Sequence, residues 1–322
     1  MSPMARYREY APSASLRSSV RAIFTFAMGA EDRDDSRHVV RRDYYREITG
    51  RSGDPLWSNL FADAHVSLVC CIGGTYSIEG LWHPLKPYSH IIGPMSAACK
   101  TIPGSAFVQV GAYFSPSGAS DFLELPICDL ADKVVGLETQ WGAEATRLDE
   151  QLNHQMDDSA RVVTLEAILL RRLLSSRRRR RGFDSSGLAA LATRLRGRIT
   201  VDKMADLAGV SRQYLSRVFQ NQIGVSPKLY CRLARFRALL AGLSVIAVDW
   251  SGVAATVGYF DQSHMIAEFR KFSGITPVQF IRAGTFHPFR WPSLETQTLL
   301  GNTESICGKP GASVTREPAS LR

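Results

Sequence analysis

The sequence predicts an α+β protein: a β-rich N-terminal part, then a helical hairpin, then an all-α C-terminal domain. Three observations support this prediction. Short apolar runs bounded by Gly and Pro occupy the N-terminal part. Apolar residues take up helical spacing from about residue 130. Two similar helical segments, 204–230 and 253–280, then follow about fifty residues apart.

Composition limits the class of protein. The chain has 322 residues, of which 45% are hydrophobic and 21% charged, so wholesale disorder is excluded. No apolar run approaches the roughly 18 residues needed to cross a bilayer. The first eleven residues lack the apolar core of a signal peptide. We therefore expect a cytoplasmic protein without a membrane partner.

The positive charge is concentrated in one third of the chain. The whole chain has 39 Lys and Arg against 30 Asp and Glu, a net charge of +9. Residues 186–290 hold 14 of the basic and 5 of the acidic residues, which accounts for the entire excess. Such a segment is expected to meet a polyanion, although charge alone does not separate DNA from RNA or an acidic membrane.

Residues 1–135 are predicted to form the β-rich domain. Strands are expected at 67–72 and 106–114, between clusters of Gly, Pro and Ser. The cysteines form no CxxC pair and the histidines lack zinc spacing, so we expect buried thiols, no metal and no cofactor. A redox or metal role is the alternative. The six cysteines are Cys70, Cys71, Cys99, Cys128, Cys231 and Cys307.

Residues 136–175 are predicted to form a helical hairpin that is a candidate for dimerisation. Its apolar stripes are Leu148, Leu152 and Met156, and then Val162, Leu165, Ile168, Leu169 and Leu173. Asp157–Asp158–Ser159 can cap the second helix. The stripes either pair two protomers or pack within one protomer, and the spacing leaves both alternatives open.

Two segments are predicted to lack regular structure. Residues 176–186 contain five consecutive arginines, Arg177 to Arg181, which repel one another and indicate an exposed linker. These arginines are either simply solvated or touch phosphate. Residues 286–322 are polar and rich in Gly, Pro and Ser, and are predicted to be a disordered tail.

The predicted C-terminal domain, 187–285, contains the repeat. Seven residues of the first copy have a matching residue fifty positions later: Leu215, Phe219, Gly224, Val225, Ser226, Pro227 and Tyr230 match Met265, Phe269, Gly274, Ile275, Thr276, Pro277 and Phe280. Ala205 and Gly209 precede Ala254 and Gly258 by forty-nine. A chance match at so many positions in one register is not expected, so each copy is interpreted as one structural unit.

The first copy has the residues of two helices joined by a tight turn. Thr200 is expected to cap the first helix, Gly209 to end it in the left-handed conformation, and Ser211 to cap the second. Residues expected to face inward are Met204, Leu207 and Ala208, and then Tyr214, Leu215, Val218 and Phe219. Those left facing outward are Arg212, Gln213, Ser216, Arg217 and Gln220, which are types that bond to base edges and phosphates. An ordinary hairpin with a solvated face is the alternative.

A connecting helix is predicted from Pro227 to about Leu243, after the cap Ser226. At 1.5 Å per residue it spans roughly 24 Å. With the flanking turns, two reading helices could lie about 34 Å apart, which is one turn of DNA. One protomer could then enter two successive major grooves, preferably of bent DNA.

This pattern closely resembles the DNA-binding domain of the AraC/XylS family of bacterial transcription regulators. The resemblance covers 187–285 and is carried by these stretches: 205 with 209–211, 215–219, 224–227, 258–264, 269–272 and 274–277. It implies seven helices and reading helices at about 211–221 and 262–272. The implied function is sequence-specific regulation of transcription, including activation, with promoter double-stranded DNA as partner and RNA polymerase as a further candidate partner.

Position in the family motif then suggests individual contacts. The base-facing residues are Gln213, Ser216 and Arg217 in the first reading helix, and Gln262, Ser263, Ile266 and Ala267, followed by Arg270, in the second. Phosphate-contact candidates are Ser211, Arg232, Arg235, His264 and Lys271, with cap-like packing the alternative for His264. The family commonly has Arg or another polar residue at position 267. Because Ala offers only apolar contact, base specificity is expected mainly from the first copy.

The N-terminal half resembles an uncharacterised sensor domain that precedes some of these DNA-binding domains, through 7–12, 114–119 and 132–142. In better-known relatives this part is a cupin-like β-barrel that binds a small effector, followed by dimerising helices. The resemblance thus implies that this part binds a small effector and that the protein forms a homodimer. Neither the effector nor the residues that bind it are assigned. His65, His83 and His90 lack the spacing of a metal cupin, so a metal-dependent enzyme is not expected.

Two other functions remain open at this point. One is a DNA-binding enzyme whose N-terminal domain transfers an alkyl group through a cysteine or transforms a small molecule. It needs an activated thiol, which Cys70 and Cys71 in an apolar run do not suit. The other is a structural nucleoid protein, which would show no sequence preference.

Overall fold

The computed structural model describes residues 4–28, 40–47, 59–82, 88–103, 106–176, 183–243 and 250–282. All of these belong to one compact unit, Met1–Pro292. The arginine run, His83, Cys307 and the tail 286–322 lie outside the described residues.

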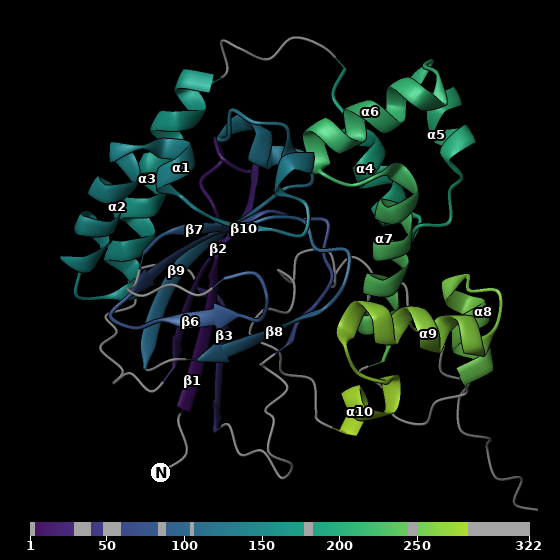
Figure 1. Cartoon of the computed structure of the whole chain (residues 1–322), viewed down its shortest axis with the longest axis horizontal. Coiled ribbons are helices and arrows are strands. Elements are labelled where there is room, and N and C mark those ends of the chain that lie inside the picture. The colour runs from purple at the N-terminus through teal and green to yellow at the C-terminus, as the bar shows by residue number, and fades with distance from the viewer. Residues whose placement is uncertain are drawn as a thin grey trace, which may run out of the picture. The chain divides into compact units, whose positions relative to one another are not determined.

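Two antiparallel sheets form the N-terminal part, which confirms the predicted β-rich fold (Figure 1). The larger sheet has the order β10-β7-β5-β9-β2-β1-β3, and the smaller one the order β4-β8-β6. The strands are β1 Met4–Tyr10, β2 Val20–Met28, β3 Val40–Glu47, β4 Asn59–Leu60, β5 Ser67–Ile72, β6 Tyr76–Ile78, β7 His90–Ile92, β8 Cys99–Pro103, β9 Phe107–Phe114 and β10 Val134–Gly136. The predicted strands at 67–72 and 106–114 correspond to β5 and β9.

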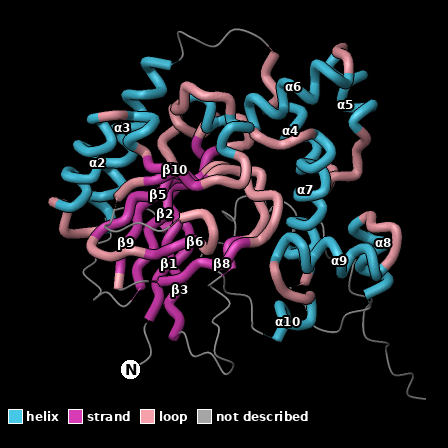
Figure 2. Tube along the Cα trace, viewed as in Figure 1, coloured by secondary structure: helices cyan, strands magenta, loops and turns pink. Residues whose placement is uncertain are grey.

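The larger sheet has an apolar core on each face, because successive strand residues point to opposite sides. On β5, Leu68 and Cys70 face a helical layer, whereas Val69 and Cys71 face the smaller sheet. The helical layer consists of α1 Glu138–Trp141, α2 Ala143–Asn153 and α3 Asp158–Ser176, with the short turns η2 Gly118–Asp121 and η3 Ile127–Leu130 before it (Figure 2). Both cysteines of the adjacent pair are buried, as predicted.

The helical hairpin of α2 and α3 is confirmed, and its predicted stripes pack inside the protomer. Leu148, Leu152, Leu165 and Leu173 all belong to the core between the helices and the sheet. Only Met156 is exposed, at 68%. The prediction of a cap is also confirmed, since the Ala160 N–H donates to Asp157 Oδ1 at 2.7 Å.

The C-terminal part contains seven helices within residues 183–243 and 250–282, as the resemblance implied. They are α4 Ser186–Arg194, α5 Val201–Ala208, α6 Arg212–Ile223, α7 Pro227–Gly242, α8 Trp250–Val257, α9 Gln262–Ser273 and α10 Pro277–Arg282. Figure 1 shows α5 and α6 at one end of α7, and α8, α9 and α10 at its other end. The connecting helix therefore separates two helix-turn-helix units.

Candidate nucleic-acid interface

The first helix-turn-helix unit, α5 and α6, forms by the local rules expected of its sequence. Thr200 Oγ1 accepts from the Lys203 N–H at 3.2 Å, and Ser211 Oγ accepts from the Tyr214 N–H at 3.2 Å. Gly209 adopts φ +64° between the two helices, where a Cβ would be strained. All three predicted roles are confirmed, so the start of α6 is fixed by hydrogen bonds on both sides of the turn.

The α6 helix buries one face and exposes the other. Leu215, Phe219 and Ile223 are fully buried. Of the predicted reading residues, Arg212, Gln213, Arg217 and Gln220 are exposed, Ser216 is half-buried, and the capping residue Ser211 is exposed. These side chains thus share one accessible polar surface, on which hydrogen bonds to base edges and phosphates can form.

Arg217 and Arg212 each contact a neighbouring side chain of the same unit and remain accessible to solvent. The Arg217 guanidinium lies 5.3 Å from the ring centroid of Tyr214, which limits its motion. Arg212 pairs with Asp202 of α5 at 2.9 Å, but both side chains are more than 60% exposed. An ion pair this exposed contributes little, so DNA phosphate can replace the carboxylate.

The second unit, α8 and α9, begins its reading helix with Asp261. Its Oδ1 accepts from the His264 N–H at 2.7 Å. The His264 side chain is 45% exposed, its ring lies edge-on to Tyr259, and its Nε2 is 3.9 Å from Glu268 Oε1. His264 therefore packs at the start of the helix, which agrees with the cap-like packing given as the alternative to phosphate contact. Part of its ring stays accessible.

The reading surface of α9 is less polar than that of α6. Ser263 and Ala267 are exposed, as are Arg270 and Lys271 toward its C-terminal end. Gln262 and Ile266 are half-buried, and Ile266 packs against the core of the C-terminal helices. The middle of this surface thus offers apolar contact, and the cations lie beside it.

Two arginines of α7 have partners within the domain. Arg232 forms an ion pair with Glu268 of α9 and lies over the ring of Phe272. Arg235 lies 5.3 Å from the ring centroid of Tyr259, and its Nη2 is 3.4 Å from the carbonyl oxygen of Gly197. Both side chains are half-buried and join α7 to neighbouring segments. Their contact with phosphate stays a prediction.

Two residues of the second unit were not singled out by the sequence. Glu268 is 5% exposed, although it is a carboxylate in a reading helix, and it joins that helix to Arg232. Phe260 is 92% exposed directly before the cap Asp261. The run Phe260–Asp261 before a helix was visible in the sequence, but only the structure shows that the ring lies in solvent.

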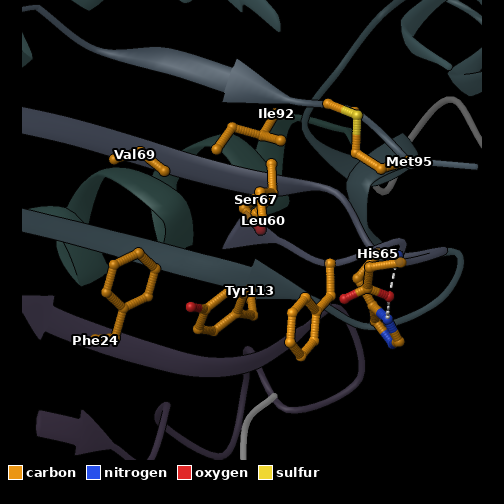
Figure 3. A pocket seen from close by; sticks show the side chains of 11 residues that line it. Phe24, Leu60, His65, Ser67, Val69, Ile92, Met95 and Tyr113 are labelled. Atoms are coloured by element: carbon orange, nitrogen blue, oxygen red, sulfur yellow. Dashed lines mark hydrogen bonds and ion pairs between the residues drawn. The ribbon is translucent and has the colours of Figure 1, made fainter. Parts of the chain in front are cut away.

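A small cavity lies in the N-terminal part, between the sheets. Its volume is about 30 Å³, and its lining includes Phe24, Asp63, His65, Met95 and Tyr113. Figure 3 shows Phe24 and Tyr113 extending from neighbouring strands, with His65 and Met95 at one end of the group. This space is enough for about one or two water molecules.

The described part of the chain shows no group of three or more His, Cys, Asp or Glu side chains able to hold a metal ion. Within the same residues, no helix is both long and apolar enough to pass through a membrane.

Comparison with known proteins identifies the C-terminal part. Residues 204–283 match the model of a helix-turn-helix domain family. An uncharacterized helix-turn-helix transcriptional regulator of Haemophilus influenzae is 23% identical over 200 residues, which is 59% of this chain. The chain spans 65% of that relative's length.

Solved structures of the regulator ToxT from Vibrio cholerae are also similar, at 9% identity. One has a TM-score of 0.40, with coverage of 71% of this chain and 93% of ToxT. Another, of ToxT bound to an unsaturated fatty acid, has a TM-score of 0.39 with coverage of 88% and 96%. Residues 204–283 thus match a helix-turn-helix domain family, and their paired motifs resemble those of AraC/XylS regulators.

Proposed function

We propose that the chain is a sequence-specific DNA-binding transcription regulator whose helices α6 and α9 enter successive major grooves of promoter DNA. One observation carries the proposal: two capped helices with accessible outer faces lie at opposite ends of α7. The 16 residues of α7 span roughly 24 Å, which with the flanking turns approaches one turn of DNA. A protein that binds promoters in bacteria works in the cytoplasm.

The two helices are proposed to divide the work of recognition. Gln213 and Arg217 can form the bidentate hydrogen bonds that distinguish bases in the major groove. On α9, Ile266 and Ala267 are limited to apolar contact, for example with a thymine methyl group. Arg270 and Lys271 beside them suit phosphate. Specificity then rests mainly on α6, while α9 adds affinity and fixes the register.

A role without catalysis is supported by the state of the thiols. The thiolate is the nucleophilic form of cysteine. Burial raises the pKa of Cys71 to about 12 and that of Cys231 to about 11, and it also raises the pKa of Cys70. Held as neutral thiols, these residues do not suit alkyl transfer.

The N-terminal domain is proposed to control DNA binding in response to a small effector. A typical metabolite pocket has a volume of 300 Å³ or more, on the order of ten times that of the cavity between the sheets. Since Phe24, Met95 and Tyr113 fill that region, a metabolite can enter only if the lining moves. Effector binding between the sheets would therefore be coupled to a conformational change.

The proposal is tested by selecting genomic DNA fragments with the purified full chain and mapping the protected bases. We expect fragments with two protected stretches in neighbouring major grooves on one side of the duplex. Arg217→Ala should weaken binding to these fragments more than binding to random DNA. Lys100→Ala, which removes a positive charge that is also exposed, on β8, is the matched control. Equal affinity of the wild type for selected and random DNA would contradict the proposal.

A second copy of the chain is the proposed partner of the outer face of α3. Val163, Ala167, Leu170 and Leu174 follow one another at intervals of four, three and four residues. These are the intervals of the apolar seam of a coiled coil. Val163 and Leu174 are 48% and 68% exposed, whereas the stripes predicted to pair protomers are buried except for Met156. This outer face thus replaces them as the proposed contact.

Sedimentation of the full chain tests this contact. We expect a dimer for the wild type, and a monomer for the double variant Val163→Glu and Leu174→Glu. Ile102→Glu changes another apolar residue, 47% exposed on β8, and should leave the dimer intact. A wild type that stays monomeric at high micromolar concentration would exclude the proposed homodimer.

A further inference from the structure

The core of the C-terminal helices contains residues of the N-terminal domain. Phe61, Ala62 and Ala64 follow β4 and belong to the same apolar cluster as the C-terminal helices. The Phe61 ring lies 6.2 Å from Phe236 of α7 and 6.2 Å from Phe280 of α10, measured between ring centroids. At 3% exposure, Phe61 is a buried residue of this core.

The same segment also hydrogen-bonds to the end of the second reading helix. The Ala62 N–H donates to the carbonyl of Phe272 at 2.8 Å, and the Ala98 N–H donates to that of Lys271 at 3.2 Å. The last carbonyls of a helix have no partner within it, and a buried one is unfavourable unless some other donor is available. Here the N-terminal domain supplies the donors for α9.

An ion pair joins this segment to the connecting helix. Arg237 Nη2 of α7 lies 2.5 Å from Asp63 Oδ1, and the guanidinium also contacts the His65 ring. The Arg237 side chain is 9% exposed and that of Asp63 25%. His65 in turn is tied to Asp63, whose Oδ1 accepts from the His65 N–H at 2.9 Å. Residues 61–65 thus contact α7, α9 and α10 together.

The N-terminal domain touches the first unit differently. It contacts α6 through η2 and η3, and Pro94 and Ile127 lie against Gly224 at the C-terminal end of that helix. At this end the Gly224 N–H donates to the carbonyls of Phe219 and Gln220, and among the described residues no backbone N–H of the N-terminal domain donates to α6. Both units thus contact the N-terminal domain, but within the described residues the backbone hydrogen bonds from that domain go to the second unit.

From this difference we infer that residues 61–65 are a positioning element of the second reading helix. Phe61 fills the angle between α7 and α10, the Ala62 N–H caps α9, and Asp63 holds Arg237. Together they set the direction of α9 relative to α7, and hence its register with α6 on the duplex. The inference rests on the proposed function for its effect on DNA, but its effect on α9 holds without DNA.

Amide hydrogen exchange of the free full chain tests the structural part. In Phe61→Ala, peptides that cover 265–282 should exchange about tenfold faster, the factor that corresponds to about 1.4 kcal/mol. Peptides that cover α6 should keep the wild-type rate. The matched control is Phe107→Ala, which removes an equally buried ring from the core between the sheets. Asp63→Asn changes no volume and should show the same pattern if Phe61→Ala fails to fold.

DNA binding tests the consequence, with the duplex recovered by genomic selection and a shortened duplex that keeps only the part read by α6. Phe61→Ala and Asp63→Asn should lose about tenfold in affinity for the long duplex and nothing for the short one. Unchanged exchange of 265–282 in both variants, or an equal increase in α6, would overturn the inference. If the exchange pattern holds while the wild type prefers no DNA sequence, the proposed function fails and the positioning element stands.

Discussion

Replacing Gly224 with alanine tests the contact between α6 and the N-terminal domain. Gly224 adopts φ +90°, where a side chain raises the energy of the backbone by about 1–2 kcal/mol. A Cβ there would lie 2.6 Å from Pro94 Cγ and 2.9 Å from the Ile127 carbonyl oxygen. Neither a proline ring nor a backbone carbonyl moves easily, so overpacking adds about 1–3 kcal/mol. We expect a total loss of roughly 2–5 kcal/mol.

Gly209→Ala is the matched control, since Gly209 also ends a helix with positive φ, +64°, but has no atom within 4 Å of a built Cβ. It should lose only the backbone contribution of about 1–2 kcal/mol. Urea unfolding of both full-length variants, followed by circular dichroism, measures the difference. If the two variants agree within about 0.5 kcal/mol, α6 is not held against Pro94 and Ile127 in solution.

Three further changes have defined outcomes. Arg217→Ala should lose about 1–3 kcal/mol of discrimination at one base pair in a binding assay with substituted duplexes, whereas Ala267→Ser should change little. Glu268→Gln removes the carboxylate that pairs with the partly exposed Arg232, and should lower the free energy of unfolding by about 1–3 kcal/mol in thermal melts. Burial, then the nearby Arg237, lowers the pKa of His65 from 6.5 to about 4. Between these two pH values the unfolded chain therefore binds a proton at His65 that the folded chain does not. The free energy of unfolding should fall by roughly 3 kcal/mol as the pH drops from 6.5 to 4, and it should fall less in His65→Gln.

The helix-turn-helix units could be predicted from sequence because their signals are local. Thr200, Gly209 and Ser211 each act within three or four residues of their own position, and all three roles are confirmed. The prediction that Leu207 faces inward is wrong, since it is 55% exposed. The α5 helix has only eight residues, and Met204 and Ala205 already fill its contact with the core. A periodic pattern over two turns does not define how wide the buried face is.

Contacts between distant segments could not be predicted in this way. In the sequence, Arg232 is one of several arginines along α7. Its partner Glu268 lies 36 residues later, on another helix. Phe61 and Asp63 belong to a stretch without periodicity, and Asp63 meets Arg237 across 174 residues of chain. The burial of Leu148 and Leu165 in their own protomer similarly depends on the sheet they cover, which helical spacing does not reveal.

The two reading helices differ in both chemistry and support, and the differences reinforce one another. On the proposed function, α6 carries the polar reading residues, and among the described residues its end receives no backbone hydrogen bond from the N-terminal domain. On the same proposal, α9 offers Ile266 and Ala267 to the bases, and the carbonyl of its residue Phe272 accepts a hydrogen bond from the Ala62 N–H of the N-terminal domain. Apolar contacts and phosphate contacts require correct placement more than strong individual bonds. On the proposed function, a signal that shifts residues 61–65 would thus change how many grooves the protein holds, and hence its affinity, without changing the bases that α6 prefers.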